Sequence, residues 1–224
     1  MSSVILVVAA HADDEVLGCG GTLARHVHDG DIVHLVFMAD GVTSRAKMTS
    51  NEQYQREAAA KNAQAALGIT SVQFLGLPDN RMDSLAFLDV VQPLEKMIQA
   101  LAPDIIYTHH DADLNIDHRI THQAVLTACR PFPWQSVREI LTFEVMSSTE
   151  WSGTSGGRAF APNVYVDISA YWEQKLQALL AYEHEMRPPP HSRSMEHLDV
   201  LSLHRGFEVG VSRAEAFYLV RSVK

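Results

Sequence analysis

Short apolar runs alternate along the chain with segments whose apolar residues recur at helical spacing. Residues 4–10 form a continuous apolar run rich in β-branched side chains, which is typical of a strand buried on both faces of a parallel sheet. Residues 18–28 have a helical pattern, and Asp29-Gly30 ends it before a second apolar run at residues 32–38. These segments predict a β-α-β unit.

The same alternation continues to about residue 129. It predicts helices near residues 51–67, 84–101 and 117–129, and strands near residues 72–75 and 105–107. Weaker patterns predict strands at residues 139–145 and 164–168, and then helices at residues 169–185 and 193–204. Parallel strands that are joined by helices place those helices against the sheet. We therefore expect one α/β domain over residues 1–224, Rossmann-like, with a mostly parallel sheet flanked by helices on both faces.

Composition narrows the class of protein. The chain has 224 residues, of which 46% are hydrophobic and 20% charged, and this excludes a disordered or fibrous protein. A net charge of -9 offers no broad basic surface to a phosphate backbone, so we expect no nucleic acid partner. The N-terminal apolar run is too short to cross a bilayer, so we expect no stable membrane insertion and a cytoplasmic location. Cys19 and Cys129 lack metal-site spacing and are expected to be buried thiols.

Potential metal ligands and proton-transfer groups follow two of the predicted strands. His11-Ala12-Asp13-Asp14-Glu15 comes after the first strand, and residues 108–118 come after the strand at residues 105–107. Because the carboxyl ends of parallel strands meet at one edge of a sheet, histidines and carboxylates from both groups can converge on one zinc ion. A divalent cation would also relieve the repulsion between neighbouring carboxylates. For Glu15 alone, an acidic helix start is an equally good interpretation.

The residues Ala10-His11-Ala12-Asp13-Asp14-Glu15 and the later pair Asp117-His118 resemble the signature of the PIG-L or LmbE-like deacetylases, Ala-His-Pro-Asp-Asp-Glu with a downstream Asp-His. The resemblance covers nearly the whole chain. It implies that His11, Asp14 and His118 bind Zn²⁺, and that Asp13 is the general base of a hydrolase. The implied substrate is a small molecule, an N-acetylglucosamine-type amino sugar or sugar conjugate that loses its acetyl group. The same ligands could accept iron, cobalt or nickel.

Chemical logic agrees with these implied roles. Adjacent residues of an extended loop point in different directions, so Asp14 can hold the metal while Asp13 faces a water molecule activated by zinc. A carboxylate within hydrogen-bond reach can take the proton of that water and pass it to the departing amine.

Two positions depart from the family pattern. Ala12 replaces the usual proline, which removes no ligand. Asn115 stands where many members carry a histidine that is thought to stabilise the transition state. An amide can donate to an oxyanion but carries no positive charge. His110, or a histidine from the C-terminal region such as His191, could take over, so the oxyanion's second partner stays open.

Further residues resemble the family's substrate-binding groups. Arg56 and Asp79 would bind sugar hydroxyls; the alternatives are an exposed helix pair for Arg56 and a turn residue for Asp79. His191 and Arg193 could reach the site from the C-terminal segment, or lie in a solvated turn. His122 is one helical turn after His118 and could orient a metal ligand.

Asp117 could orient a ligand in the same way, although a helix cap is the stronger interpretation.

Two other classes of function are considered. A hydratase or lyase could add water to an unsaturated acidic metabolite, and cationic side chains such as Arg45, Arg81 and Arg193 would favour it if they converged. A non-catalytic sugar-binding module is disfavoured, because all three implied ligands and the implied base are present. The sequence leaves the oligomeric state open, a homo-oligomer included.

Overall fold

A seven-stranded sheet forms the centre of the molecule in the computed structural model, which describes residues 2–41, 50–153 and 159–224. The strands are β1 (Val4–Ala9), β2 (Ile32–Ala39), β3 (Ser71–Leu77), β4 (Ile105–His109), β5 (Glu139–Phe143), β6 (Val164–Asp167) and β7 (Ala214–Ser222). Their order in the sheet is β3-β2-β1-β4-β5-β7-β6, and β1 to β5 are parallel. The predicted α/β fold with a mostly parallel sheet is confirmed.

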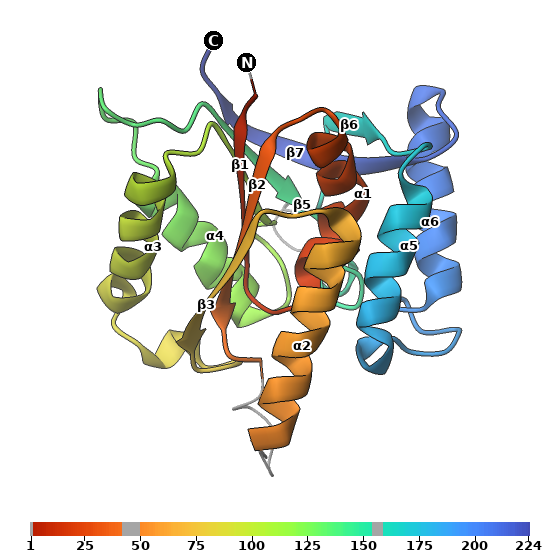
Figure 1. Cartoon of the computed structure of the whole chain (residues 1–224), viewed down its shortest axis with the longest axis horizontal. Coiled ribbons are helices and arrows are strands. Elements are labelled where there is room, and N and C mark those ends of the chain that lie inside the picture. The colour runs from red at the N-terminus through yellow and green to blue at the C-terminus, as the bar shows by residue number, and fades with distance from the viewer. Residues whose placement is uncertain (1, 42–49, 154–158) are drawn as a thin grey trace.

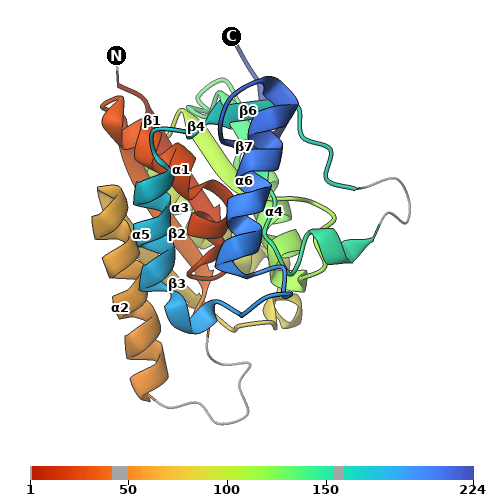
Figure 2. The same ribbon diagram turned by 90° about the vertical axis from the view of Figure 1, so that its right-hand side faces the viewer.

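Helices cover both faces of this sheet (Figures 1 and 2). They are α1 (Asp14–His28), α2 (Ser50–Leu67), α3 (Phe87–Leu101), α4 (Ile116–Ala128), α5 (Trp172–Ala181) and α6 (Met195–Val209). Helices α3 and α4 lie on one face, and α1, α2, α5 and α6 lie on the other. Ile5 and Val7 of β1 belong to one buried apolar cluster, whereas Leu6 and Val8 belong to the other. Burial on both faces explains why β1 is apolar at every position.

Strand β7 is absent from the sequence prediction, which placed no element after residue 204. It lies between β5 and β6 and runs antiparallel to both. The charged Glu215 interrupts its apolar pattern, yet that side chain is buried. The aromatic and β-branched run from Phe217 to Val220 was the available signal.

Several predicted boundaries also differ from the structure. Helix α1 begins at Asp14 rather than at residue 18, because the acidic loop already forms its first turn. Its glycines allow close packing: a Cβ added at Gly21 would lie 2.9 Å from side-chain atoms of Ile168. Helix α5 is shorter than predicted and α6 ends five residues later, at Val209 instead of residue 204.

Strand β1 runs downward from the N-terminus in Figure 1, and both termini lie at the top. Because β2 to β5 are parallel to β1, their carboxyl ends lie at the same, lower edge of the sheet. The loop after β1 and the start of α4 therefore meet at the lower edge, which positions the candidate site. Among the described residues, no helix combines the length and the apolar composition that a bilayer crossing requires.

Candidate metal centre and active site

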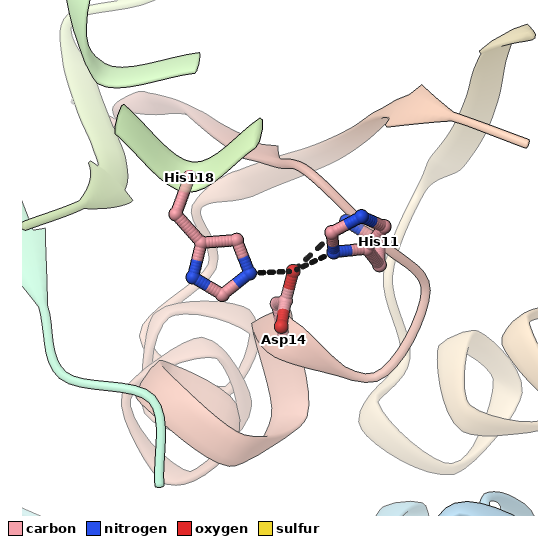
Figure 3. A group of neighbouring side chains, drawn as sticks. All are labelled: His11, Asp14 and His118. Atoms are coloured by element: carbon pink, nitrogen blue, oxygen red, sulfur yellow. Dashed lines mark hydrogen bonds and ion pairs between the residues drawn. The ribbon is translucent and has the colours of Figure 1, made fainter. Parts of the chain in front are cut away.

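His11, Asp14 and His118 form a buried cluster at this edge (Figure 3). Asp14 Oδ2 lies 3.4 Å from His11 Nδ1 and 3.3 Å from His118 Nε2. Zinc ligands at ~2.0–2.1 Å in a tetrahedral arrangement are separated from one another by about 3.3 Å. The two separations match that value, and one carboxylate with two imidazoles is a common zinc donor set. The residues therefore fit a zinc ion.

Electrostatics at the cluster favour a cation. Burial alone would raise the pKa of Asp14, but the neighbouring imidazoles of His118 and His109 hold it well below its usual range. Burial opposes the protonation of His118, yet Asp14 and Asp113 raise its pKa to about 9. Burial lowers the pKa of His109 well below its usual value, and His118 lowers it further. Asp14 thus requires positive charge beside it, which protons or a metal ion can supply.

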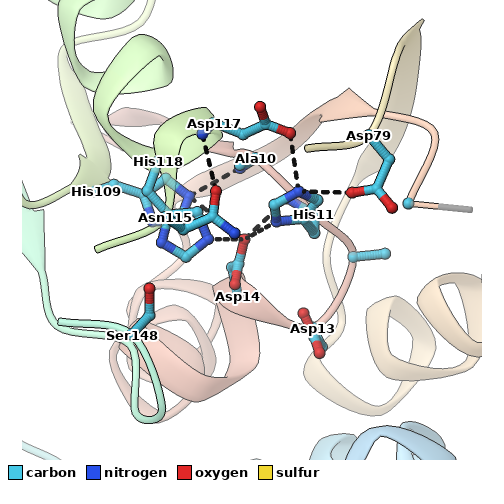
Figure 4. Close-up of polar contacts among 12 residues, drawn as sticks. Ala10, His11, Asp13, Asp14, Asp79, His109, Asn115, Asp117, His118 and Ser148 are labelled. Atoms are coloured by element: carbon cyan, nitrogen blue, oxygen red, sulfur yellow. Dashed lines mark hydrogen bonds and ion pairs between the residues drawn. The ribbon is translucent and has the colours of Figure 1, made fainter. Parts of the chain in front are cut away.

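The other ring nitrogen of His11 faces two carboxylates (Figure 4). His11 Nε2 lies 3.0 Å from Asp79 Oδ1 and 3.2 Å from Asp117 Oδ2. Asp117 also accepts the backbone N–H groups of Asn80 at 2.6 Å and Met82 at 3.1 Å. Carboxylates in this position fix the tautomer and orientation of a ligating imidazole. These three residues are also a second group that could hold a metal ion, but it would share His11 with the first.

The preferred interpretation of Asp117 as a helix cap is wrong. The cap of α4 is Asn115, whose side-chain oxygen accepts the N–H of Asp117 at 2.8 Å. Asp117 instead connects His11 to the Asn80–Met82 segment, because both of its oxygens accept from there. The alternative interpretation of Asp79 as a mere turn residue also fails, since its carboxylate is buried against His11.

Asp113 supports His118 in a similar way, and the sequence analysis gave it no role. Its Oδ1 lies 3.1 Å from His118 Nδ1 and accepts the hydroxyl of Ser148, while Oδ2 accepts Thr149 Oγ1 at 2.6 Å. Burial would raise the pKa of Asp113, but His118 and these hydroxyl groups lower it to about 2. Asp113 lies among the potential ligands at residues 108–118, which the sequence shows. The hydroxyl groups that it accepts come from the loop after β5, and no sequence pattern indicates them.

Asp13 lies beside the cluster, and its carboxylate points away from that of Asp14 (Figure 4). Its backbone has a φ of 126°, a strained conformation for a non-glycine residue. Arg193 Nη1 donates to Asp13 Oδ2 at 2.8 Å, and Arg56 Nη2 lies 3.9 Å from Oδ1. Burial raises the pKa of Asp13, and the two arginines offset only part of this effect.

Glu15 accepts the N–H of Asp13 at 3.0 Å and the Tyr182 hydroxyl at 2.7 Å. Burial raises its pKa to about 8. Of the two interpretations that the sequence left open, the start of α1 agrees with the structure, because Glu15 lies in the first turn of that helix.

The two predicted arginines reach the site from distant segments. Arg56 of α2 is largely buried and donates to the carbonyl oxygens of Gly41 at 3.1 Å and Ala12 at 3.2 Å, so it is no exposed helix residue. Arg193 also donates from Nε to Ser147 Oγ at 3.0 Å. Both guanidinium groups face Asp13.

Three predicted histidines lie apart from the cluster. His191 accepts the N–H of Arg193 at 3.0 Å, and its ring contacts Trp151. His110 packs edge-on against Phe160 and lines a cavity of about 440 Å³ together with His122. His122 donates from Nδ1 to the carbonyl oxygen of His109 at 2.9 Å, so it supports the strand end rather than His118 itself.

Asn115 engages both atoms of its carboxamide. The oxygen caps α4, and Nδ2 donates to Asn80 Oδ1 at 3.1 Å. Of the arginines considered for an acidic substrate, Arg81 is exposed and Arg45 lies outside the described residues.

With this geometry established, the chain can be compared with known proteins. The family model described as "PIG-L: GlcNAc-PI de-N-acetylase" matches residues 6–129, which span β1 to the end of α4 and include all three candidate ligands. The chain belongs to the PIG-L family. The prediction of an enzyme of the metal-dependent deacetylase class is confirmed by this membership.

Two relatives named as deacetylases support the assignment, and a solved structure is similar in fold. The uncharacterised deacetylase YaiS of Escherichia coli K12 is 33% identical over 78% of this chain and 88% of its own length. A 1D-myo-inositol 2-acetamido-2-deoxy-alpha-D-glucopyranoside deacetylase of Thermobifida fusca is 27% identical over 80% of this chain and 82% of its own length. The crystal structure of GalB, a 4-carboxy-2-hydroxymuconate hydratase of Pseudomonas putida KT2440, superposes with a TM-score of 0.78 at 22% identity, covering 100% of this chain and 98% of that one. The last likeness concerns the fold alone.

Proposed function

We propose that this PIG-L chain is a zinc-dependent hydrolase that removes the N-acetyl group from an N-acetylglucosamine-type amino sugar or sugar conjugate. The observation that carries the proposal is the donor set of His11, Asp14 and His118 at zinc-like separations, next to the carboxylate of Asp13. Zinc held by these three residues would polarise the acetyl carbonyl and make a water molecule more acidic.

Asp13 is the proposed general base. Its carboxylate takes a proton from the attacking water and returns it to the sugar nitrogen as the carbon–nitrogen bond breaks, so that acetate and a free amine leave. The raised pKa of Asp13 suits both steps, because the carboxylate must hold the proton from the water before it can transfer that proton to the sugar nitrogen. Arg193 and Arg56 hold this carboxylate in place, as their contacts with its two oxygens indicate.

Asn115 is the proposed neutral donor to the oxyanion. Its Nδ2 could exchange Asn80 Oδ1 for the substrate oxygen, at the start of the helix that carries His118. His110 is less suitable, because its ring faces Phe160 and the separate cavity. Arg56, Arg193 and His191 are the proposed contacts to the sugar. Asp79 can join them with the carboxylate oxygen that faces away from His11, and the buried His11 contact predicts a second role in orienting that ligand.

An acetate-release assay across N-acetylated sugars tests the proposal. Zinc-loaded wild-type protein should release acetate, and Asp13→Asn should lower kcat by about 10²–10⁴-fold with little change in zinc affinity. A matched control is Asp89→Asn, which also replaces an aspartate by an asparagine but lies in α3, outside the described site. If wild type and Asp13→Asn act alike on every sugar of the panel, the proposed mechanism is wrong.

A hydratase of an unsaturated acidic metabolite is the second candidate. The observation in its favour is the pair of arginines that face Asp13, since guanidinium groups bind carboxylates well. Unsaturated dicarboxylic acids incubated with the zinc-loaded protein would then lose ultraviolet absorbance, and no acetate would appear from amino sugars. Acetate release without any loss of absorbance would exclude this candidate.

A further inference from the structure

One buried imidazole contacts both halves of the candidate metal centre. His109 is the last residue of β4, and its side chain is completely buried. Its Nε2 accepts the backbone N–H of Ala10, the residue before His11, at 2.8 Å. Its ring also stacks on the ring of His118, with 3.9 Å between centroids and 20° between planes (Figure 4). His109 therefore contacts the loop that carries one candidate histidine ligand and the ring of the other, and these two candidates come from different parts of the chain.

The hydrogen bond from Ala10 excludes His109 as a metal ligand in this arrangement. An imidazole nitrogen that accepts an N–H has its lone pair occupied, and the proton of the neutral ring is then on Nδ1. His109 Nδ1 has no hydrogen-bond partner in the part of the chain that the structure describes. His109 Nε2 lies 3.5 Å from Asp14 Oδ2, but the hydrogen bond from Ala10 occupies its lone pair, so this nitrogen cannot also bind an ion beside Asp14 in this arrangement.

The unpartnered nitrogen also argues against a purely structural role. A buried N–H without an acceptor costs roughly 1–3 kcal/mol, and a fully buried strand end would be better filled by an apolar side chain. A phenylalanine could stack on His118 but could not accept the Ala10 N–H, and an aliphatic side chain could do neither. Only a ring with an acceptor nitrogen makes both contacts.

We propose that His109 is a positioning residue for the metal centre: its acceptor nitrogen fixes the loop that carries His11, and its ring fixes the plane of His118. This inference rests on the proposed function, because it requires that these histidines bind a metal ion. It adds a residue outside the ligand set that determines how well the set is preorganised.

Two substitutions separate the contacts. His109→Phe keeps a flat ring against His118 and removes the acceptor, whereas His109→Gln places an amide oxygen near the position of Nε2 and removes the ring. Because partners that orient a metal ligand are typically worth 10–100-fold in metal affinity, each variant should bind zinc about tenfold more weakly than wild type. Zinc affinity is measured by competition with a chromophoric chelator, on protein whose circular dichroism matches wild type.

Cobalt supplies a second readout that a change in stability does not produce. The visible absorption of bound Co²⁺ depends on ligand geometry, so both variants should change the spectrum as well as the affinity. His122→Gln is the matched control, because His122 is a buried histidine of α4 whose side chain donates to the backbone carbonyl of His109 at the same strand end. It should lower stability and leave zinc affinity and the cobalt spectrum unchanged.

The outcomes are distinguishable. If the wild-type chain binds zinc but His109→Phe and His109→Gln bind it equally well, or if His122→Gln loses as much affinity as they do, this inference is overturned and the proposed function stands. If the wild-type chain binds neither zinc nor cobalt, both fail. Should His109→Phe not fold, His109→Gln alone still decides, because it retains the hydrogen bond to Ala10.

Discussion

A buried ion pair outside the candidate metal centre offers the sharpest test of how the fold is held together. Glu215 of β7 accepts Lys175 Nζ of α5 at 2.6 Å, and both side chains are about 95% buried, with exposures of 4% and 5%. Glu215 also accepts the N–H groups of Gly21 at 2.9 Å and Thr22 at 2.7 Å, and the Thr22 hydroxyl at 2.6 Å. The carboxylate thus connects α1, α5 and β7.

Glu215→Gln should lower the free energy of unfolding by about 3–5 kcal/mol, the usual cost of leaving one partner of a buried ion pair without the other. The ammonium group of Lys175 would keep its hydrogen bond to the carbonyl oxygen of Leu17 at 3.1 Å but would lose its counterion. The amide nitrogen of the new glutamine would also place a hydrogen-bond donor against the N–H groups of Lys175, Gly21 and Thr22. At ~2–4 °C per kcal/mol for a chain of this size, the melting temperature should fall by about 6–20 °C.

Urea denaturation followed by circular dichroism measures the effect. The double variant Lys175→Met/Glu215→Gln removes the uncompensated charge and should be more stable than Glu215→Gln alone. Glu95→Gln is the control, since Glu95 pairs with the exposed Arg130 at 3.2 Å and should cost no more than ~1 kcal/mol. Equal stability of Glu215→Gln and the control, or a double variant no more stable than the single one, would refute the reasoning.

Three further predictions concern the metal, the thiols and acid. Removal of the metal by a chelator should abolish acetate release and lower the melting temperature, and added Zn²⁺ should restore both, because a ligand that binds only the folded state stabilises it. Burial raises the pKa of Cys19 and brings that of Cys129 to about 12, so neither should react with a thiol reagent at pH 8 until urea unfolds the chain. The folded pKa of Asp113, about 2, lies below its unfolded value of ~3.9, so its stabilisation is present above pH 4 and lost as the pH falls toward 2. Asp113→Asn should therefore cost about 2 kcal/mol in urea denaturation at pH 7, and the cost should shrink between pH 4 and pH 2.

Local pattern was sufficient for the part of the fold that carries the ligands. Strand β1 could be recognised because it is buried on both faces, and the acidic loop after it could be placed at the sheet edge by topology alone. The same reasoning places residues 108–118 at that edge. Strand β7 was missed although the run from Phe217 to Val220 indicates a strand, because the charged Glu215 interrupts the apolar pattern and its partner Lys175 lies 40 residues earlier in the chain.

At the candidate site, too, the contacts that could not be predicted from the sequence join distant segments of the chain. The pairing of His118 with Asp113 is local, but the Ser148 and Thr149 hydroxyls that stabilise Asp113 come from another loop, and no spacing rule predicts them. A charged residue such as Arg56 in a polar helix is expected to be exposed. It is buried because Gly41, Ala12 and Glu185 surround it. By resemblance, Asn115 stands where many family members carry a histidine, which left the oxyanion's second partner open; the structure adds that Asn115 caps α4.

The chemistry of the candidate site therefore depends on two kinds of residue, and only one of them forms a pattern that can be recognised in the sequence. Ligands must be histidines or carboxylates at fixed strand ends, so they form a pattern that can be recognised within a few residues. The groups that orient them can be any acceptor at the right place: Asp79 and Asp117 for His11, Asp113 for His118. Because the second kind is chosen by geometry, spacing along the sequence does not identify it.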